Sequence, residues 1–329
     1  MTRVLLTGGA GYIGSACLRW MLKQGYDAYA YDNLSEGNRL AVPDHEHRLI
    51  EGDILDTDLF YKTLVENKIE VVMHFAAVAS VPDSIKDPEL YWRVNVMGTK
   101  SVLDAMVKAG VGKLVFSSTA ATYSFDNDLP LQAHSSQVPK VPYGVTKLAC
   151  ESLIKDYAYT YDLGCTIMRY FNASGADPNG NYGEARRSES HLIPLVLYTA
   201  LGKRDAIYVY GNNWNTPDGT CLRDFVHVDD ISYAHELSIS HIQTHQVDAF
   251  NIGLGKGTSV NEIISLSEEV VGKSINKAYK DRRPGDPGTL YTDPQKLISQ
   301  LGWKPYYTNV KDIIETAWNW HVKNPEGYK

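Results

Sequence analysis

Short apolar runs alternate with amphipathic stretches through the first half of the chain. Apolar runs of this length are typical of parallel strands that are buried on both faces, and the intervening stretches repeat apolar residues at helical spacing. Strands joined by such helices form right-handed βαβ units, in which the helices pack as layers on one parallel sheet. The pattern predicts five strands in this half, at residues 3–7, 27–32, 47–51, 71–75 and 113–117.

The same reading predicts two long helices. Residues 99–109 carry apolar side chains at helical spacing, and Gly110 follows where a helix would stop. A second helix is expected over 142–161, because Pro142 suits the first position of a helix. A sixth strand is expected at 165–170.

The composition of the sequence changes after Asn172. Glycine, proline, asparagine and aspartate gather at 175–183 and again at 211–219, which indicates irregular loops. We therefore expect two lobes, with residues 1–172 and 224–253 in the sheet domain and 173–223 and 254–329 in a smaller ligand-binding lobe. No internal repeat or low-complexity tract is seen.

Composition excludes several classes of protein. The net charge of -7 argues against broad nucleic-acid binding, which requires a basic surface. The start does not read as a secretion signal, and the apolar stretch 192–201 is too short to span a membrane. The four cysteines show no metal-ligand spacing, so we expect no metal site and buried thiols in a reducing cytoplasm.

Three glycines follow the first predicted strand at a functional spacing. Gly8, Gly11 and Gly14 form G-x-x-G-x-x-G at the start of a helix, where they permit a tight turn and close approach of a pyrophosphate. Asp32 ends the second strand about twenty residues later, where a carboxylate accepts hydrogen bonds from ribose hydroxyls and repels a 2'-phosphate. The alternative is that Asp32 is only a turn residue before Asn33. Together these residues favour NAD and predict a Rossmann-type, doubly wound parallel α/β sheet with a smaller C-terminal lobe.

Tyr143 and Lys147 lie four residues apart on a predicted helix, so both project from one face. The run from Ser117 to Thr119 ends a strand at the edge where such sheets bind ligands. Tyr143 could take a proton from an alcohol while the cofactor takes a hydride. Lowering its pKa from about 10 to near 7 requires about 4 kcal/mol, which a cation at about 4 Å supplies at an effective dielectric of about 20. We expect Lys147 to be that cation, helped by the positive nicotinamide ring, although such pairs are common in a chain with 22 tyrosines.

A set of segments resembles the extended short-chain dehydrogenase/reductase superfamily, and within it the 4-epimerases of UDP-hexoses. The resemblance runs nearly end to end. It is carried by HFAA (74–77), NVMGT (95–99), FSST (116–119), YGVTK (143–147), RYFN (169–172), GAD (175–177), DGTCLRDFVHV (218–228) and RRPGD (282–286).

The resemblance implies roles for particular residues. Tyr143 is the expected base, Lys147 orients the cofactor, and Thr119, where serine is usual, holds the 4'-hydroxyl of the sugar. The NAD-binding residues implied are Gly8, Gly11, Tyr12, Ile13, Gly14, Asp32, Asn33, Asp53, Ile54, Phe75, Ala76, Ala77, Asn95, Ser117, Tyr143, Lys147 and Tyr170. The UDP-sugar residues implied are Thr119, Tyr143, Asn172, His191, Leu192, Arg223, Arg283, Asp286 and Leu290.

The implied reaction oxidises C4 of a UDP-hexose to a ketone, lets the sugar turn, and returns the hydride to the other face. A dehydratase or decarboxylase is an alternative, but Ala120 and Ala121 follow Thr119 where dehydratases carry an acid pair. An NAD-sensing module without catalysis is a third reading. At Leu290 the family sets the room for an N-acetyl group, so UDP-N-acetylhexosamines and UDP-pentoses stay open as substrates.

Other features leave alternatives open. Ala79 stands where some members have lysine, and His191 where many have asparagine. Arg223 could instead pair with Asp224 or Asp230, and Arg283 could be a solvated loop charge. The resemblance also implies a homodimer paired through helices 99–109 and 142–161, although packing on the sheet explains their apolar faces equally well.

Overall fold

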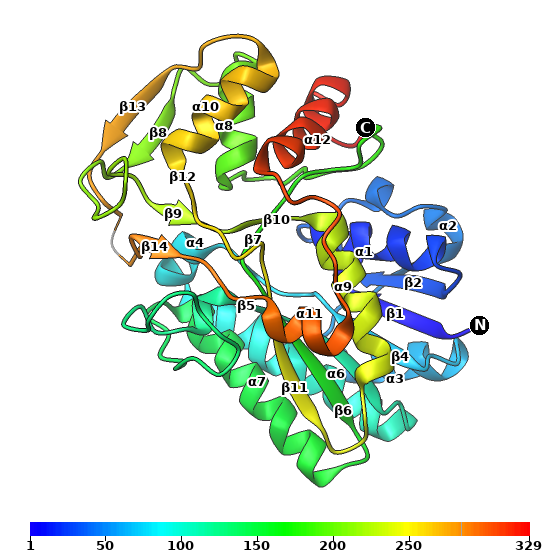
Figure 1. The fold of residues 1–329 in the computed structure, drawn as a ribbon. Coiled ribbons are helices and arrows are strands. Elements are labelled where there is room, and N and C mark those ends of the chain that lie inside the picture. The colour runs from blue at the N-terminus through cyan, green and yellow to red at the C-terminus, as the bar shows by residue number, and fades with distance from the viewer. Residues whose placement is uncertain (284) are drawn as a thin grey trace.

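The protein is described by a computed structural model that covers residues 1–283 and 285–329. Its centre is a sheet of seven parallel strands in the order β11-β6-β5-β4-β1-β2-β3 (Figure 1). The order reverses between β1 and β4, which creates the switch point at which such folds bind ligands. The strands are β1 (Arg3–Thr7), β2 (Asp27–Asp32), β3 (Leu49–Glu51), β4 (Val71–His74), β5 (Lys113–Thr119), β6 (Gly164–Tyr170) and β11 (Val247–Ile252).

Helices cover both faces of this sheet, so the strands are buried on both sides and need no polar alternation. One apolar cluster joins the sheet to α1 (Tyr12–Lys23), α9 (Val228–His241) and α11 (Gln295–Leu301). A second cluster joins the other face to α3 (Thr57–Glu66), α6 (Gly98–Ala109) and α7 (Pro142–Thr160). The predicted fold class is confirmed.

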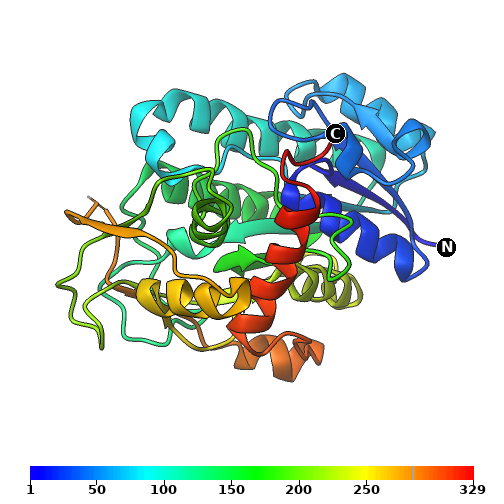
Figure 2. The same cartoon turned by 90° about the horizontal axis from the view of Figure 1, so that it is seen from above.

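A second set of elements lies beyond the carboxyl ends of the strands (Figure 1). Its core is built from α8 (Leu192–Ala200), α10 (Val260–Val271), α12 (Val310–Lys323) and the strand pair β8 (Ile207–Tyr210) and β13 (Lys277–Lys280). From above, α10 and α12 cross within this lobe (Figure 2). Two small sheets connect it to the main sheet: β12 (Thr258–Ser259), β9 (Leu222–Arg223) and β14 (Thr289–Leu290), and β10 (Phe225–His227) with β7 (Asn172–Ser174).

One predicted strand was partly wrong. Residues 47 and 48 belong to the short helix α2 (His45–Arg48), and β3 begins only at Leu49. The cause is a turn at Asp44, whose φ is 48° and whose carbonyl accepts the N–H groups of His47 and Arg48.

The remaining short α-helices are α4 (Val81–Lys86) and α5 (Pro88–Tyr91). The second of these continues into a π-type turn at Trp92–Met97. In the described part of the chain, no helix has the length and apolar character that crossing a membrane requires.

Candidate functional site

A cleft of about 440 Å³ follows the carboxyl ends of β1, β2 and β4 at the switch point. The N-terminus of α1 forms its floor, and residues 183–186 with Tyr328 close it from the C-terminal lobe. Of the predicted cofactor residues, those that line it are Gly8, Gly11, Tyr12, Ile13, Gly14, Asp32, Asn33, Asp53, Ile54, Phe75, Ala76, Ala77 and Tyr170. Ala79 lines it as well, with no cation at that position.

The glycines of the first turn are required by close backbone contacts. Gly8 has a φ of 69°, and a Cβ there would lie 2.6 Å from the backbone nitrogen of Ala76. A Cβ on Gly14 would lie 2.1 Å from the carbonyl oxygen of Gly8. The turn therefore brings bare backbone and the first N–H groups of α1 to the cleft, a geometry that fits the pyrophosphate of a dinucleotide.

Asp32 combines the two roles considered from the sequence. Its carboxylate accepts the backbone N–H groups of Ala10 at 3.0 Å and Leu34 at 2.8 Å, so it holds the turn. It also lines the cleft, and a Cβ on Gly37 would lie 2.9 Å from its Oδ1. Burial raises the pKa of Asp32 above its usual value. Beside it, the amide of Asn33 donates to Asp53 at 3.0 Å.

Tyr143, Lys147 and Thr119 meet at the carboxyl end of β5. Tyr143 is 9% exposed and Lys147 is 4% exposed, both on α7. Lys147 donates from Nζ to the carbonyl oxygen of Ser117 at 2.8 Å and lies over the ring of Phe116. Burial lowers the pKa of Lys147 to about 8.

The lowering of the Tyr143 pKa that we expect from Lys147 and the nicotinamide ring together is not present in the protein alone. Burial raises the pKa of Tyr143 above its usual value, and a hydrogen bond from Thr119 and the charge of Arg186 only partly oppose this. Lys147 is itself desolvated and directs its ammonium to the Ser117 carbonyl. A positive pyridinium beside the phenol is the further charge that NAD supplies when bound.

Two predicted cofactor residues lie behind the wall of the cleft instead of on it. Asn95 is buried, and its amide bonds the backbone N–H and carbonyl of Val78 and the hydroxyl of Thr146. Ser117 is buried with its hydroxyl 2.8 Å from that of Tyr170. Their polar groups are satisfied by the protein, so both position residues that line the cleft.

The predicted diphosphate residues gather in the C-terminal lobe. The charges of Arg223, Asp286 and Arg283 all act on the thiol of Cys221, whose pKa is raised by burial. Arg283 pairs with Asp286 at 3.0 Å, so it is not simply solvated. Pro284, in the same segment, lies outside the described residues.

Arg223 has neither of the partners considered from the sequence. The Asp224 carboxylate accepts the backbone N–H groups of Leu254, Gly255 and Thr292. The Asp230 carboxylate accepts those of Tyr306 and Tyr307. In residues 1–283 and 285–329, no ion pair of Arg223 is found. Its guanidinium donates to the neighbouring carbonyl of Leu222, and a hydrogen bond from Arg223 acts on the Cys221 thiol.

The predicted sugar residues come from both lobes. Leu290 pairs with Arg223 across β14 and β9 and packs on a cluster that includes Ala120 and Phe171, the neighbours of Thr119 and Asn172. His191 precedes Leu192 at the start of α8, and its Nδ1 lies 2.7 Å from Oε1 of Glu184.

Sequence reasoning missed a buried ion pair beneath the catalytic residues. Arg169 binds Glu151 through two hydrogen bonds of 2.9 and 2.6 Å, and both side chains are almost fully buried. Ser118 also donates to Glu151 at 2.5 Å. Glu151 is four residues after Lys147 on α7, a spacing that could have indicated one polar face.

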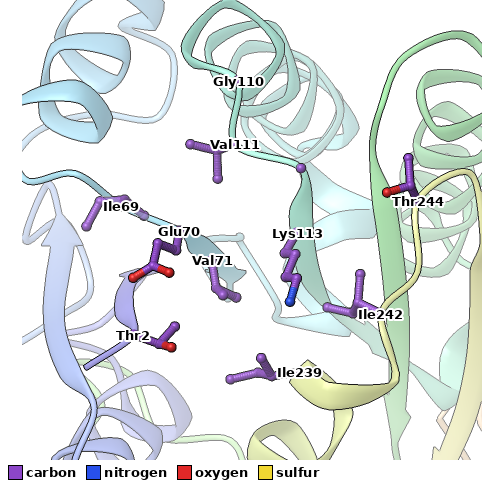
Figure 3. Close-up of a pocket in the computed structure, with 11 residues that line it drawn as sticks. Thr2, Ile69, Glu70, Val71, Gly110, Val111, Lys113, Ile239, Ile242 and Thr244 are labelled. Carbon is purple, nitrogen blue, oxygen red and sulfur yellow. The ribbon is translucent and has the colours of Figure 1, made fainter.

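A second pocket, of about 430 Å³, opens at the opposite edge of the sheet (Figure 3). It is lined by the starts of β4 and β5 and by the end of α9, with Glu70 and Lys113 among the labelled side chains. None of the predicted site residues lines it. Because ligands of open parallel sheets bind at the carboxyl ends of the strands, we assign the chemistry to the first cleft.

Fold and cleft define a class: a Rossmann-fold enzyme that binds a dinucleotide at the switch point and an anionic ligand under a second lobe. The sequence model of the NAD dependent epimerase/dehydratase family matches residues 4–253. The chain belongs to this family.

Individual relatives agree with this assignment. The chain is 43% identical over 326 residues to a UDP-glucose 4-epimerase of Halalkalibacterium halodurans, covering 99% of this chain and 97% of the relative. It is similar to the structure of UDP-glucose 4-epimerase from Brucella ovis in complex with NAD, with a TM-score of 0.92, 42% identity and 97% and 98% coverage. The enzyme from Bifidobacterium longum in complex with NAD+ and UDP matches with a TM-score of 0.95, 35% identity and 99% and 100% coverage.

Proposed function

We propose that this protein interconverts UDP-glucose and UDP-galactose by NAD-dependent oxidation and reduction at C4. The observation that carries the proposal is the buried Tyr143 beside Thr119 at the end of β5, between the dinucleotide cleft and the C-terminal lobe. The similar proteins from Halalkalibacterium halodurans and Bifidobacterium longum are UDP-glucose 4-epimerases, which supports the same reaction.

NAD binds along the cleft, with its pyrophosphate at the start of α1 and its adenosine ribose at Asp32. Bound NAD supplies a hydride acceptor and donor. Asp53 and Ile54 contact the adenine side, while Phe75, Ala76 and Ala77 form the channel wall. Each lobe binds one of the two ligands. Residues 1–172 and 224–253 hold the cofactor, and residues 173–223 and 254–329 hold the nucleotide sugar.

Tyr143 takes the proton of the 4'-hydroxyl as the C4–H bond gives up its hydride, which leaves a 4-ketose. Thr119 holds the same hydroxyl and sets the direction of its proton. Lys147 orients the cofactor and, together with the positive pyridinium of bound NAD, would stabilise the phenolate. After the sugar turns, the hydride returns to the other face of C4 and Tyr143 gives its proton back, so the net redox change is zero.

The uridine diphosphate is held by Asn172, Leu192, Arg223, Arg283 and Asp286. Planar guanidinium groups pair well with phosphate oxygens. One terminal nitrogen of Arg223 donates to the Leu222 carbonyl, and within the described residues Arg223 has no acidic partner. Strong binding of the nucleotide keeps the ketose from escaping while the sugar turns. His191 and Leu290 bound the space in which it turns.

Related reactions are less well supported. Elimination of water needs an acid next to Thr119, where this chain has Ala120 and Ala121. The nearby Glu151 is locked to Arg169; although burial alone would raise its pKa, Arg169 holds it below its usual value. It is therefore no proton donor. UDP-N-acetylhexosamines and UDP-pentoses are second candidates, decided by the space at Leu290.

The test is an assay of the purified protein with NAD on UDP-galactose, with UDP-glucose measured by chromatography. We expect conversion by the native chain and a loss of about 100-fold or more in Tyr143→Phe, since a positioned acid–base group contributes at least that much. Tyr143→Phe should still bind NAD. A native chain that binds NAD but leaves UDP-galactose unchanged rules out the reaction, and a fully active Tyr143→Phe rules out the assigned base.

The assembly and compartment are also part of this proposal. We propose a homodimer paired through α6 and α7, where Met97 and Tyr159 expose large apolar surfaces at the ends of these helices. Four free, buried cysteines support a reducing compartment such as the cytoplasm. Light scattering after gel filtration measures the molar mass of the protein in solution. A monomeric mass at micromolar concentration would contradict the proposed homodimer.

A further inference from the structure

Residues 183–187, which we call the strap, cross from the C-terminal lobe to the cofactor cleft. Gly183, Ala185 and Arg186 line the cleft, facing the glycine turn and Tyr12. At its far end the strap reaches the other lobe, where Arg187 donates to the carbonyl oxygen of Leu34 at 3.0 Å. The strap therefore forms a wall of the cleft that the main sheet does not provide.

Three hydrogen bonds and one packing contact fix the start of the strap. The hydroxyl of Tyr328 accepts the N–H of Gly183 at 3.0 Å and donates to its carbonyl at 3.1 Å. A Cβ on Gly183 would lie 2.4 Å from the ring of Trp320, so this glycine lies directly on α12. The indole of Trp320 donates to the carbonyl oxygen of Glu184 at 2.9 Å. These contacts give the following side chains a defined position.

Glu184 holds Arg186 in one orientation. Its carboxylate is 4% exposed, and Oε1 lies 2.6 Å from Nε of Arg186 and 2.7 Å from Nδ1 of His191. Within the described ranges, the two terminal nitrogens of Arg186 have no hydrogen-bond partner, and neither is buried. The carboxylate thus fixes the near side of the guanidinium and leaves its other donors free at the cleft.

Glu184, Glu189 and His191 also bring three potential metal ligands within 4.8 Å of one another. The Glu184 carboxylate is already bound to the guanidinium of Arg186, with Oε1 at 2.6 Å from Nε. A guanidinium in that position repels a cation. The cluster is therefore better explained as the support of Arg186 than as a metal site.

Charge shows what Arg186 could bind. The acidic residues along the cleft are Asp32, Glu36 and Asp53, and the cations among its described lining are Arg93 and Arg186. Arg93 belongs to the π-type turn after α5. The charge of Arg186 acts on three phenols, those of Tyr12, Tyr143 and Tyr170. Burial raises the pKa of each phenol, and the charge of Arg186 opposes this increase. Arg186 therefore lies near enough to these three phenols for its charge to act on each of them.

We propose that Arg186 binds the pyrophosphate of NAD from the side of the cleft opposite α1, and that Glu184 orients it for this purpose. The inference rests on the binding of NAD that the proposed function requires. The helix start offers only N–H groups and a partial positive charge to a group with two negative charges. Arg186 adds a full charge and two free donors on the facing wall.

The experiment compares NAD binding by the full chain and three variants after removal of bound nucleotide. Arg186→Gln removes the charge, Arg186→Lys keeps it without the planar group, and Arg187→Gln is the matched control, since Arg187 is exposed and does not line the cleft. Titration calorimetry gives the Kd for NAD at low and high salt. Circular dichroism and thermal unfolding of the NAD-free proteins show whether each variant is folded.

A lost charge-assisted hydrogen bond should raise the Kd of Arg186→Gln by about 10- to 100-fold. We expect a smaller increase for Arg186→Lys, a change below about 2-fold for Arg187→Gln, and a weaker salt dependence once the charge at 186 is gone. Equal affinity of Arg186→Gln and the native chain overturns the inference but leaves the proposed function intact. Failure of the native chain to bind NAD overturns both. If Arg186→Gln does not fold, the Arg186→Lys variant provides the test. A Kd for NAD and a salt dependence equal to those of the native chain would then contradict a contact between the planar guanidinium and the pyrophosphate.

Discussion

Tyr143 and Lys147 show, at the scale of single residues, how burial favours the neutral form of both members of a catalytic pair. Burial raises the pKa of Tyr143 and lowers that of Lys147 to about 8. Proximity in sequence therefore does not by itself activate the phenol. The charges that oppose burial must come from the surroundings, and Arg186 is one of them.

The ion pair of Glu151 and Arg169 gives a residue-scale prediction on stability. In Glu151→Gln the buried guanidinium loses its counter-charge, which should lower the free energy of unfolding by about 3–5 kcal/mol. Denaturant titration measures the change. Glu269→Gln is the control, because its pair with Lys311 at 2.9 Å is exposed and should contribute at most about 1 kcal/mol. Similar losses in the two variants would contradict the role given to burial.

At the scale of elements, the cofactor cleft depends on how closely α1 approaches the turn after β1. Gly14 is the point of contact, with the Gly8 carbonyl where a Cβ would be. The catalytic residues depend in the same way on α7 meeting the end of β5, and the substrate residues on β14 pairing with β9. Each part of the site is set by one junction between two elements.

Gly14→Ala tests the first junction. A Cβ 2.1 Å from a carbonyl oxygen must push α1 away from the turn, so we expect the Kd for NAD to rise by about 10-fold or more, together with a loss of about 1–3 kcal/mol of stability. Calorimetry and denaturant titration give the two quantities. Lys23→Ala, at the exposed end of α1 and outside the lining of the cleft, is the control. Native affinity in Gly14→Ala would mean that the helix need not approach the turn.

Leu290 tests the junction of β14 and β9. Shortening it in Leu290→Ala widens the space beside Thr119, so the ratio of kcat/KM for UDP-N-acetylgalactosamine to that for UDP-galactose should rise. One bulky apolar group in a pocket is worth about 1–3 kcal/mol, a factor of about 10 to 200. Leu290→Phe should lower the ratio. If both variants keep the native ratio, Leu290 does not limit the sugar.

Over the whole molecule, burial of titratable groups links stability to pH. His74, His227, His235 and His321 have pKa values lowered by burial to about 3, 3, 4 and 4. Since these values lie below those of the unfolded chain, the stability they contribute is present above about pH 6.5 and is lost as the pH falls toward about 4. Asp224 and Asp230 act in the opposite sense, because burial raises both pKa values to about 6.

His235→Phe isolates one of these histidines, which stacks on Phe75 at 4.9 Å. Phenylalanine has no proton to gain in the unfolded chain. Relative to the native chain, the variant should therefore gain about 1.4 kcal/mol of stability for each unit that the pH falls between about 6.5 and 4. Denaturant titrations at several pH values measure this difference. A difference that is the same at every pH would contradict the lowered pKa of His235.

The sequence alone determined much of the fold. The strands Arg3–Thr7 and Asp27–Asp32 were predicted to the residue, because a short apolar run bounded by polar residues is typical of a strand buried on both faces. Gly8, Gly11 and Gly14 were recognisable from their spacing, and at Gly8 and Gly14 backbone contact excludes a side chain. Local spacing likewise placed Tyr143 and Lys147 on one helix face.

Tertiary structure alone decided which polar groups meet and what surrounds them. Nothing local relates Arg186 to the glycine turn, or Trp320 to Glu184, since these contacts join segments far apart in the chain. Asn95 matched a motif, yet its amide is satisfied by Val78 and Thr146 behind the cleft wall. Periodicity records which face of an element is buried, whereas desolvation, pairing and pKa depend on the neighbours that folding brings to that face.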